Sequence, residues 1–257
     1  MSDPLPIAGD FLSLLAQQRV SPLKILDSPA APQQTQATTV FAFQFAEGVL
    51  MVGDRRATAG NVIVTDQIEK VIEIDSTSLL AIAGVPATAF EMARVLQTSF
   101  EYYRRSQLQV LSLPAKVRAL ARLLRENLPM TMQGIGVVVP LFAGVDHSVN
   151  PPRPQIFFYD PLGAQFQAVG FAASGSGAAT IRSILHFQDR YSQPRQSELS
   201  LPEAVKFALR VLMAAAEFDS ATGGVDPLKQ TYATMKVLRA DGVTTISSEE
   251  QAQHLAA

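Results

Sequence analysis

The fold is decided by residues 38–56, which read TTVFAFQFAEGVLMVGDRR. Thr38 to Phe45 are mostly β-branched or aromatic, and such residues favour a β-strand. Glu47-Gly48 then supplies a turn, and Val49 to Val52 form a second apolar run. The pattern predicts a β-hairpin that ends in a polar turn at Asp54-Arg55-Arg56.

Upstream of this hairpin, the composition changes abruptly at Thr38. Residues 1–37 hold five of the sixteen prolines, and residues 29–37 contain neither a charge nor a large apolar residue. We therefore predict an extended leader over residues 1–37, with one short helical stretch after Asp10, and a folded domain over residues 38–257. Composition alone favours a disordered tail as the alternative.

Downstream of the hairpin, blocks of strands alternate with pairs of helices. Strands are expected at 69–74, 79–83, 135–143, 155–159, 165–169, 232–238 and 243–246, and helices at about 86–103, 114–128, 177–191 and 202–218. Each helix pair has one apolar face, and the strands suffice for two sheets. This order predicts an α+β fold built as a four-layer αββα sandwich.

The composition of the whole chain excludes several classes of protein. Of the 257 residues, 47% are hydrophobic and 17% charged, which excludes a disordered chain and suggests that some apolar surface is buried against partner subunits. A net charge of −2 gives no reason to expect a nucleic-acid or membrane partner. The chain has no cysteine and three histidines, so a cysteine nucleophile is excluded and neither a metal nor another cofactor is expected. With no apolar run of about 18 residues and no secretion signal, a cytoplasmic location is expected.

The turn from Gly175 to Thr180 resembles a phosphate-binding loop, because it follows a strand and opens a helix. However, the third glycine and an acidic partner for a ribose are missing. A tight turn in which Ser176 caps the third helix is therefore the favoured interpretation.

Lys70 is the most informative charge in the strand expected at 68–74. Alternation places it on one face with three isoleucines, and places two glutamates and Val71 on the opposite, wetter face. The side chains concerned are Ile68, Ile72 and Ile74 and, opposite them, Glu69 and Glu73. A lysine on an apolar face needs a partner or takes a lowered pKa, and both are common at active sites. Asp54 is the candidate partner; the alternative is a lysine that reaches the edge of the sheet, with Asp54 in a solvated corner.

Thr38 brings these observations together. A chain that begins at this threonine carries a hydroxyl nucleophile and an α-amine on the same residue, and an unperturbed α-amine has a pKa of about 7.7–8.0, well suited to a general base. A buried lysine beside the hydroxyl favours loss of its proton. This chemistry needs neither histidine nor cysteine, but it requires the removal of residues 1–37.

Four motifs now follow one another at a recognisable spacing: Thr38-Thr39-Val40, Gly53-Asp54-Arg55-Arg56-Ala57-Thr58, Lys70 and Ala83-Gly84. Three further stretches extend the pattern: Asn127-Leu128 with Met132-Gln133-Gly134, Gly175-Ser176-Gly177, and Asp219 to Gly224. Together they resemble the β subunit of the 20S proteasome, in its bacterial form, over about residues 38–245.

This resemblance implies an N-terminal nucleophile hydrolase fold and a threonine endopeptidase that degrades unfolded proteins. It implies autocatalytic cleavage between Ala37 and Thr38, after which Thr38 acts as the nucleophile. Asp54 would hold Lys70, Lys70 would lower the pKa of the hydroxyl, and the Gly84 N–H would stabilise the oxyanion. Three further residues would order the amine and a nearby water, namely Ser176, Asp219 and Thr222. The substrate-binding positions implied are Ala57, Thr58, Ile68, Ile72, Ile82, Pro86 and Phe90, which predicts a preference for apolar residues before the scissile bond.

Two residues depart from the family pattern. Ala37 stands where a glycine usually precedes the nucleophile, and glycine reaches strained backbone angles that help self-cleavage. Pro86 stands where the family offers a backbone N–H to an extended substrate, and proline has none. We therefore expect slower maturation and one substrate contact fewer.

The implied partners are proteasome α subunits and other β subunits, stacked as heptameric rings with two β rings between two α rings, and an ATP-dependent unfoldase ring. Three alternatives remain open at this point. The first is the simpler two-ring threonine protease of bacteria, the second a structural ring subunit without activity, and the third a self-processing amidase for small molecules. Intact Thr38, Asp54, Lys70 and Gly84 argue against an inactive subunit.

Overall fold

The computed structural model describes residues 35–37 and 39–256. These residues belong to one compact unit, which runs from Gln34 to Ala257. The helical stretch expected after Asp10, most of the leader and Thr38 itself lie outside the described residues.

The predicted hairpin is present at the centre of a five-stranded antiparallel sheet. Its two strands, β2 (Thr39–Phe45) and β3 (Gly48–Gly53), pair from Val40 opposite Gly53 to Phe45 opposite Gly48. The order in this sheet is β11-β2-β3-β12-β13, and its other strands are β11 (Phe171–Gly175), β12 (Thr234–Arg239) and β13 (Gly242–Thr245). The polar turn after β3 therefore emerges from the middle of a sheet.

A second five-stranded antiparallel sheet carries the chain that follows Lys70. Its order is β10-β9-β8-β7-β6. The strands are β6 (Val71–Asp75), β7 (Ser78–Ala81), β8 (Leu141–Asp146), β9 (Arg153–Tyr159) and β10 (Gln165–Gln167).

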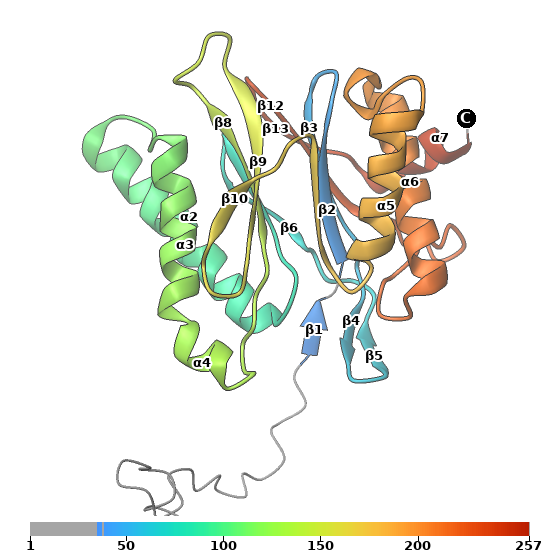
Figure 1. Cartoon of the computed structure of the whole chain (residues 1–257), viewed down its shortest axis with the longest axis horizontal. Helices are drawn as coiled ribbons and strands as arrows, with labels where there is room; N and C mark the ends of the chain where they lie inside the picture. Colours follow the sequence, from blue (N-terminus) through green and yellow to red (C-terminus); the bar gives the residue numbers. More distant parts are fainter. Residues whose placement is uncertain (1–34, 38, 257) are drawn as a thin grey trace, which may run out of the picture. The chain divides into compact units, whose positions relative to one another are not determined.

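Helices cover the outer face of each sheet, and the inner faces of the two sheets pack against each other (Figure 1). On one side lie α2 (Pro86–Gln107), α3 (Leu113–Glu126) and the short α4 (Leu128–Met132). On the other side lie α5 (Ala178–Tyr191), α6 (Leu201–Phe218), the 3-10 turn η1 (Gln196–Glu198) and the C-terminal α7 (Ser248–Ala256). The predicted mixture of helices and antiparallel sheets is thus confirmed.

A small third sheet joins the end of the leader to the domain. It consists of β1 (Thr35–Ala37), β4 (Ala57–Ala59) and β5 (Val62–Thr65), in the order β1-β4-β5. Thr35 pairs with Ala59 and Ala37 with Ala57, antiparallel. The last residues before Thr38 are therefore extended and held by the segment that follows the Asp54 turn.

Two predictions about strands are wrong in detail. The strand expected at 135–143 begins only at Leu141, because Gly136 has a φ of 65° and Pro140 has no N–H to give to a ladder. Val71, expected on a wetter face, is fully buried between the sheets, because the outer and inner faces of this sheet are both covered. In the part of the chain that the structure describes, no helix is long and apolar enough to cross a membrane.

Candidate active site

The predicted contact between Lys70 and Asp54 is present at the start of β6. Both side chains are fully buried, and the Lys70 ammonium donates to Asp54 Oδ1. Asp54 also accepts three backbone N–H groups, from Thr39 at 3.1 Å, Arg56 at 2.9 Å and Gly223 at 2.8 Å. The carboxylate is thereby held by four donors from four separate parts of the chain.

Burial sets the electrostatics of this pair. It lowers the pKa of Lys70 from its ordinary value, against the attraction of the Asp54 charge. It also raises the pKa of Asp54, against the same attraction and the hydrogen bonds from Lys70, Gly223 and Arg56. Lys70 therefore holds its proton less firmly than an exposed lysine does, which suits a group that assists proton transfer.

A second carboxylate, Asp219, lies at the end of α6 with two hydroxyls on it. Ser176 Oγ and Thr222 Oγ1 both donate to Asp219 Oδ2, and Ala221 N donates to Oδ1 at 3.1 Å. Burial alone would raise the pKa of Asp219, but the hydrogen bonds from Ser176, Thr222 and Ala221 outweigh it and lower the pKa below 3.8. Asp219 is therefore ionised at neutral pH and acts only as an acceptor.

Ser176 does not have the role that its position before a helix suggested. The residue that caps α5 is Gly177, and no side chain closes the helix there. Ser176 Oγ points to Asp219 instead.

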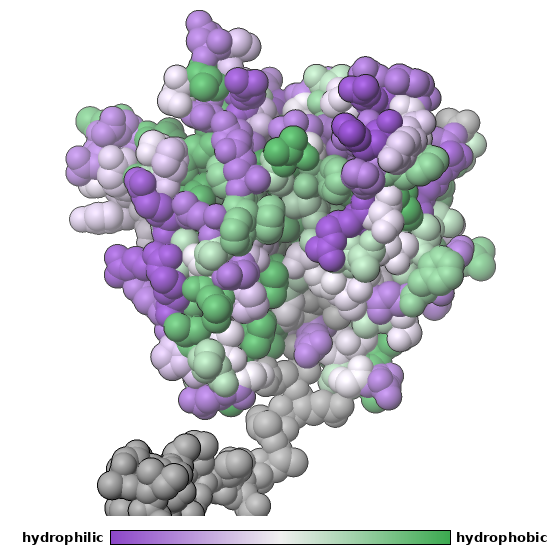
Figure 2. All heavy atoms as spheres, viewed as in Figure 1, coloured by the Kyte–Doolittle hydropathy of each residue, from purple (hydrophilic) through white to green (hydrophobic). Residues whose placement is uncertain are grey.

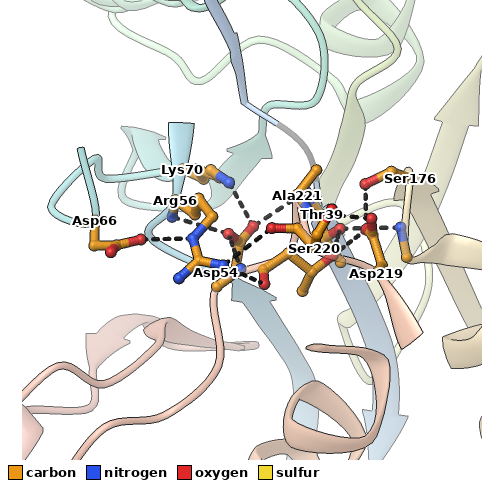
Figure 3. Close-up of polar contacts among 12 residues, drawn as sticks. Thr39, Asp54, Arg56, Asp66, Lys70, Ser176, Asp219, Ser220 and Ala221 are labelled. Atoms are coloured by element: carbon orange, nitrogen blue, oxygen red, sulfur yellow. Dashed lines mark hydrogen bonds and ion pairs between the residues drawn. The ribbon is translucent and has the colours of Figure 1, made fainter. Parts of the chain in front are cut away.

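Thr39 lies between the two carboxylates, as Figure 3 shows. Its N–H donates to Asp54 Oδ1, and its hydroxyl lies 2.5 Å from Thr222 Oγ1 and accepts from Gly177 N at 3.2 Å. The sequence alone assigned no role to Thr39. Its position directly after Thr38 was the one feature that could have marked it as part of the site.

Arg56 is a second residue that sequence reasoning left without a role. Its guanidinium binds the Asp66 carboxylate at 2.8 Å, and also donates to the backbone oxygens of Ser220 at 3.0 Å and Thr222 at 3.4 Å (Figure 3). Since Arg56 N also donates to Asp54, this one residue connects the Asp54 turn with the segment that holds Asp219. Nothing in the local sequence indicates that contact, which spans more than 160 positions.

Gly84 follows β7 and has a backbone that only glycine adopts readily. Its φ is 108°, and a Cβ built there would lie 2.1 Å from the Val137 carbonyl oxygen. The flanking residues pair with the segment behind it, since Val85 N donates to Val137 O and Val139 N to Ala83 O. Within residues 35–37 and 39–256, the Gly84 N–H has no acceptor.

All of the predicted substrate-binding residues except Thr58 are apolar, and four of the seven are buried, namely Ala57, Thr58, Ile82 and Pro86. Ala57 and Thr58 belong to β4, Pro86 opens α2, and Ile72, Ile82 and Phe90 share the core between the second sheet and α2. Ile68 is partly buried. A hollow of about 390 Å³ is lined by Ile72 and Phe90. It is also lined by charged residues to which the sequence assigned no binding role, namely Glu69, Glu73, Arg94 and Lys236. Its charges are balanced, and Lys236 pairs with Glu69 at 3.4 Å.

The nucleophile proposed from the sequence, Thr38, lies outside the described residues. Its neighbours in the chain are described: Ala37 ends β1 opposite Ala57, and Thr39 begins β2 beside Asp54. Because consecutive Cα atoms are about 3.8 Å apart, Thr38 is attached within one residue of the Asp54 and Asp219 network.

Comparisons with known proteins show the family to which the chain is similar. The model of the family described as "Proteasome subunit" matches residues 34–227. The protein named proteasome subunit beta of Acidothermus cellulolyticus is 38% identical over 252 residues, covering 95% of this chain and 84% of the relative. Its namesake in Acidimicrobium ferrooxidans is 38% identical over 245 residues, with 95% and 85% covered. Proteasome subunit beta 2 of Thermomonospora curvata is 36% identical over 245 residues, with 95% and 84% covered.

Proposed function

Because the chain belongs to the proteasome subunit family, we propose that it is a catalytic β subunit of a 20S proteasome core and acts as a threonine endopeptidase. The observation that carries this proposal is the buried Lys70–Asp54 pair directly beside Thr39, the residue bonded to the proposed nucleophile. The two packed sheets with outer helices support an N-terminal nucleophile hydrolase sandwich of four layers.

The reaction is an acyl transfer that requires no cofactor. Once residues 1–37 are removed, Thr38 Oγ attacks the scissile carbonyl, and its proton passes to the α-amine, directly or through a water. Lys70 favours loss of that proton, and Asp54 holds Lys70 in place. The Gly84 N–H stabilises the oxyanion. The C–N bond then breaks, the amine leaves with a proton, and water hydrolyses the ester on Thr38.

Removal of the leader uses the same Thr38 hydroxyl on the Ala37–Thr38 bond, but not the α-amine, because its nitrogen is still part of that amide bond. Thr38 Oγ attacks the Ala37 carbonyl carbon while Lys70 favours loss of its proton through a water. The C–N bond then breaks, the nitrogen takes a proton and becomes the α-amine, and water hydrolyses the ester to release residues 1–37. The pairing of β1 with β4 supports this proposal, because it presents Thr35–Ala37 in the extended form in which a peptide substrate binds a strand edge. Ala37 in place of glycine makes this step slower. Because Pro86 has no backbone N–H, we expect the edge of β4 to supply the N–H groups that bind the substrate.

The direct test replaces Thr38 by alanine or by serine in the full-length chain. Thr38→Ala removes the nucleophile, so we expect that the leader is retained and that peptide hydrolysis falls by more than roughly a thousandfold. Thr38→Ser keeps a hydroxyl and is the matched control, with both activities retained at a lower rate. Intact mass reports leader loss, and a fluorogenic peptide reports hydrolysis. An alanine variant that processes itself in isolation and cleaves peptides would refute the mechanism. A wild-type chain that neither loses the leader nor cleaves would favour a structural ring subunit.

The apolar side chains of Ala57, Ile72 and Phe90 support a preference for apolar side chains before the scissile bond. Burying an unpaired charge there costs several kcal/mol, whereas a leucine or phenylalanine gains about 1.5–3 kcal/mol. Ala57→Val should narrow the space and slow cleavage after Phe and Tyr more than after Ala or Val. Peptides that differ only at this residue provide the measurement. Faster cleavage after Arg or Glu than after Leu or Tyr would show that the binding residues are misassigned.

A further inference from the structure

We propose that Thr39 is a positioning residue for the reaction, and that its hydroxyl aligns the Thr222–Asp219 group while its backbone holds Asp54. This inference rests on the proposed function, since it concerns how the same site is ordered. It starts from the observation that one buried residue contacts both halves of the site.

The backbone of Thr39 is bound to Asp54 in both directions. Thr39 N donates to Asp54 Oδ1 at 3.1 Å, and Thr39 O accepts from Asp54 N at 3.1 Å. The same Asp54 oxygen accepts from Lys70. The residue bonded to Thr38 is therefore fastened to the Lys70–Asp54 pair through its main chain, independently of its side chain.

The direction of the side-chain hydrogen bonds follows from counting donors. Asp219 is ionised and can only accept, so the Thr222 hydroxyl uses its single proton on Asp219 Oδ2. In the 2.5 Å contact between the two threonines, Thr39 must then be the donor. The Thr39 oxygen in turn accepts from Gly177 N at 3.2 Å. The chain of bonds runs from Gly177 N–H through Thr39 and Thr222 to Asp219, and each bond strengthens the next.

Gly177 provides an independent sign that this contact is tight. Its φ is −77°, so its backbone is open to any residue. A Cβ built there, however, would lie 2.7 Å from Thr222 Oγ1 and 3.0 Å from Thr39 Oγ1. The start of α5 therefore approaches the two hydroxyls so closely that only glycine leaves them room.

Loss of the Thr39 hydroxyl removes one link without removing any group that we assign to the chemical step. Thr222 Oγ1 loses its donor and Gly177 N loses its acceptor, in a site where neither is exposed to solvent. The Thr222 hydroxyl is then free to turn from Asp219. In the proposed function the substrate binds at β4 and not at Thr39. We therefore expect the loss of the Thr39 hydroxyl to lower kcat and to leave KM nearly unchanged.

The experiment compares Thr39→Ser with Thr39→Ala in the full-length chain, because serine and alanine differ only by the hydroxyl oxygen. We expect Thr39→Ala to lower kcat by roughly 10- to 100-fold with KM changed less than about twofold, and to slow leader loss. Thr39→Ser should stay within about threefold of wild type in each. Gly177→Ala, which keeps both hydroxyls but separates them, should show the same kcat loss as Thr39→Ala.

Three outcomes would overturn the inference. One is a kcat for Thr39→Ala within about twofold of wild type, and another is a Thr39→Ser variant as impaired as Thr39→Ala, which would assign the effect to the methyl group. The third is a loss that appears in KM alone. If Thr39→Ala does not fold, Gly177→Ala carries the same test. Thr38→Ala separates the two proposals: if it is inactive while Thr39→Ala is normal, the positioning role fails and the proposed function stands.

Discussion

In the part of the chain that the structure describes, two buried lysines each pair with an aspartate, and one of these pairs belongs to the proposed site. Lys70 pairs with Asp54, whereas Lys116 on α3 pairs with Asp75 at 2.5 Å and donates to Thr77 Oγ1 at 2.7 Å. Lys116 lies far along the chain from every residue with a proposed catalytic role, and packs against the Phe100 ring. The second pair therefore serves as an internal control for what burial of a lysine does by itself.

Lys70→Met and Lys116→Met should both destabilise the protein, but only the first should abolish peptide hydrolysis. Removing one member of a buried pair typically costs about 3–5 kcal/mol, because the other charge stays buried without its partner. The cost should be smaller at Lys116, since Asp75 is partly exposed. Thermal unfolding and peptide turnover are measured on both variants. Near-normal peptide turnover by Lys70→Met would mean that Lys70 has only a structural role. If turnover falls equally in Lys70→Met and Lys116→Met, the fall would be explained by lost stability and not by lost catalysis.

Asp75 makes stability depend on pH in the acid range. Burial raises its pKa, but hydrogen bonds from Lys116, Ser78 and Thr77 outweigh this and lower the pKa below 3.8. The folded state therefore binds the proton less tightly than the unfolded state, so the stabilisation is complete above about pH 5 and is lost as the pH falls through the folded pKa. Urea unfolding of wild type and Asp75→Asn should give a difference in free energy that shrinks from about pH 5 to about pH 3. A difference independent of pH would contradict this.

At the scale of elements, the turn between β7 and α2 places Gly84 against the segment that precedes β8. Isolated pairing of Gly84 with Val138 holds this segment beside the turn. The apolar residues at 137–139, which suggested a strand, are instead the support behind the proposed oxyanion site. Their backbone N–H and carbonyl groups bond to Val85 and Ala83, and Val139 O also accepts from the Ser174 hydroxyl on β11.

Gly84→Ala should prevent correct folding, whereas Gly134→Ala should be tolerated. Both glycines have positive φ, 108° and 73°. A Cβ at Gly84 meets the Val137 backbone at 2.1 Å, but a Cβ at Gly134 has no atom within 4 Å. Gly134→Ala therefore costs only the backbone strain, about 1–2 kcal/mol. Soluble yield and melting temperature of the two variants are the measurements. Similar losses in both would show that strain, and not the contact with Val137, governs this turn.

At the scale of the whole molecule, the surface of the folded unit carries much apolar area. Figure 2 shows hydrophobic side chains interspersed with hydrophilic ones on the face viewed. On α5 and α6, Phe187 is 60% exposed, Tyr191 72% and Phe218 81%. Membership of the proteasome subunit family implies assembly with other subunits, and exposed aromatic residues are typical of surfaces that assembly covers.

The double variant Phe187→Ser/Phe218→Ser should weaken assembly without lowering the stability of the folded chain. Both rings are largely exposed in the single chain, so their loss removes little internal packing. Sedimentation velocity with and without an α partner measures assembly, and Leu228→Ser, which changes a residue 97% exposed outside these helices, is the control. Unchanged sedimentation would exclude this face from the contacts. A wild-type chain that sediments as a monomer even with an α partner present would count against the proposed stacked rings. Assembly without any α partner would favour the simpler two-ring protease.

The sequence by itself determined the parts that depend on neighbours in the chain. The β2–β3 hairpin follows from its β-branched and aromatic run, and the helices α2, α3, α5 and α6 from their apolar spacing. The contact of Lys70 with Asp54 was foreseen because a lysine among isoleucines needs a nearby charge. Even the family resemblance depends on short motifs at fixed spacing, none of which requires knowledge of how the sheets pack.

Only the tertiary structure decided which distant residues complete the site. Thr39 meets Thr222 across 183 positions and Gly177 across 138, and Arg56 meets Ser220 across 164. A threonine hydroxyl or a backbone oxygen leaves no periodic signal in the sequence, so such contacts are invisible until the strands and helices are packed. The burial of Val71 could not be foreseen for the same reason. Alternation shows that the two faces of a strand differ, but it does not show that a second sheet covers one of them. The packing of α5 and α6 on the sheet that contains β2 brings the starts of β2 and α5 and the end of α6 to one point, and that convergence makes the proposed site.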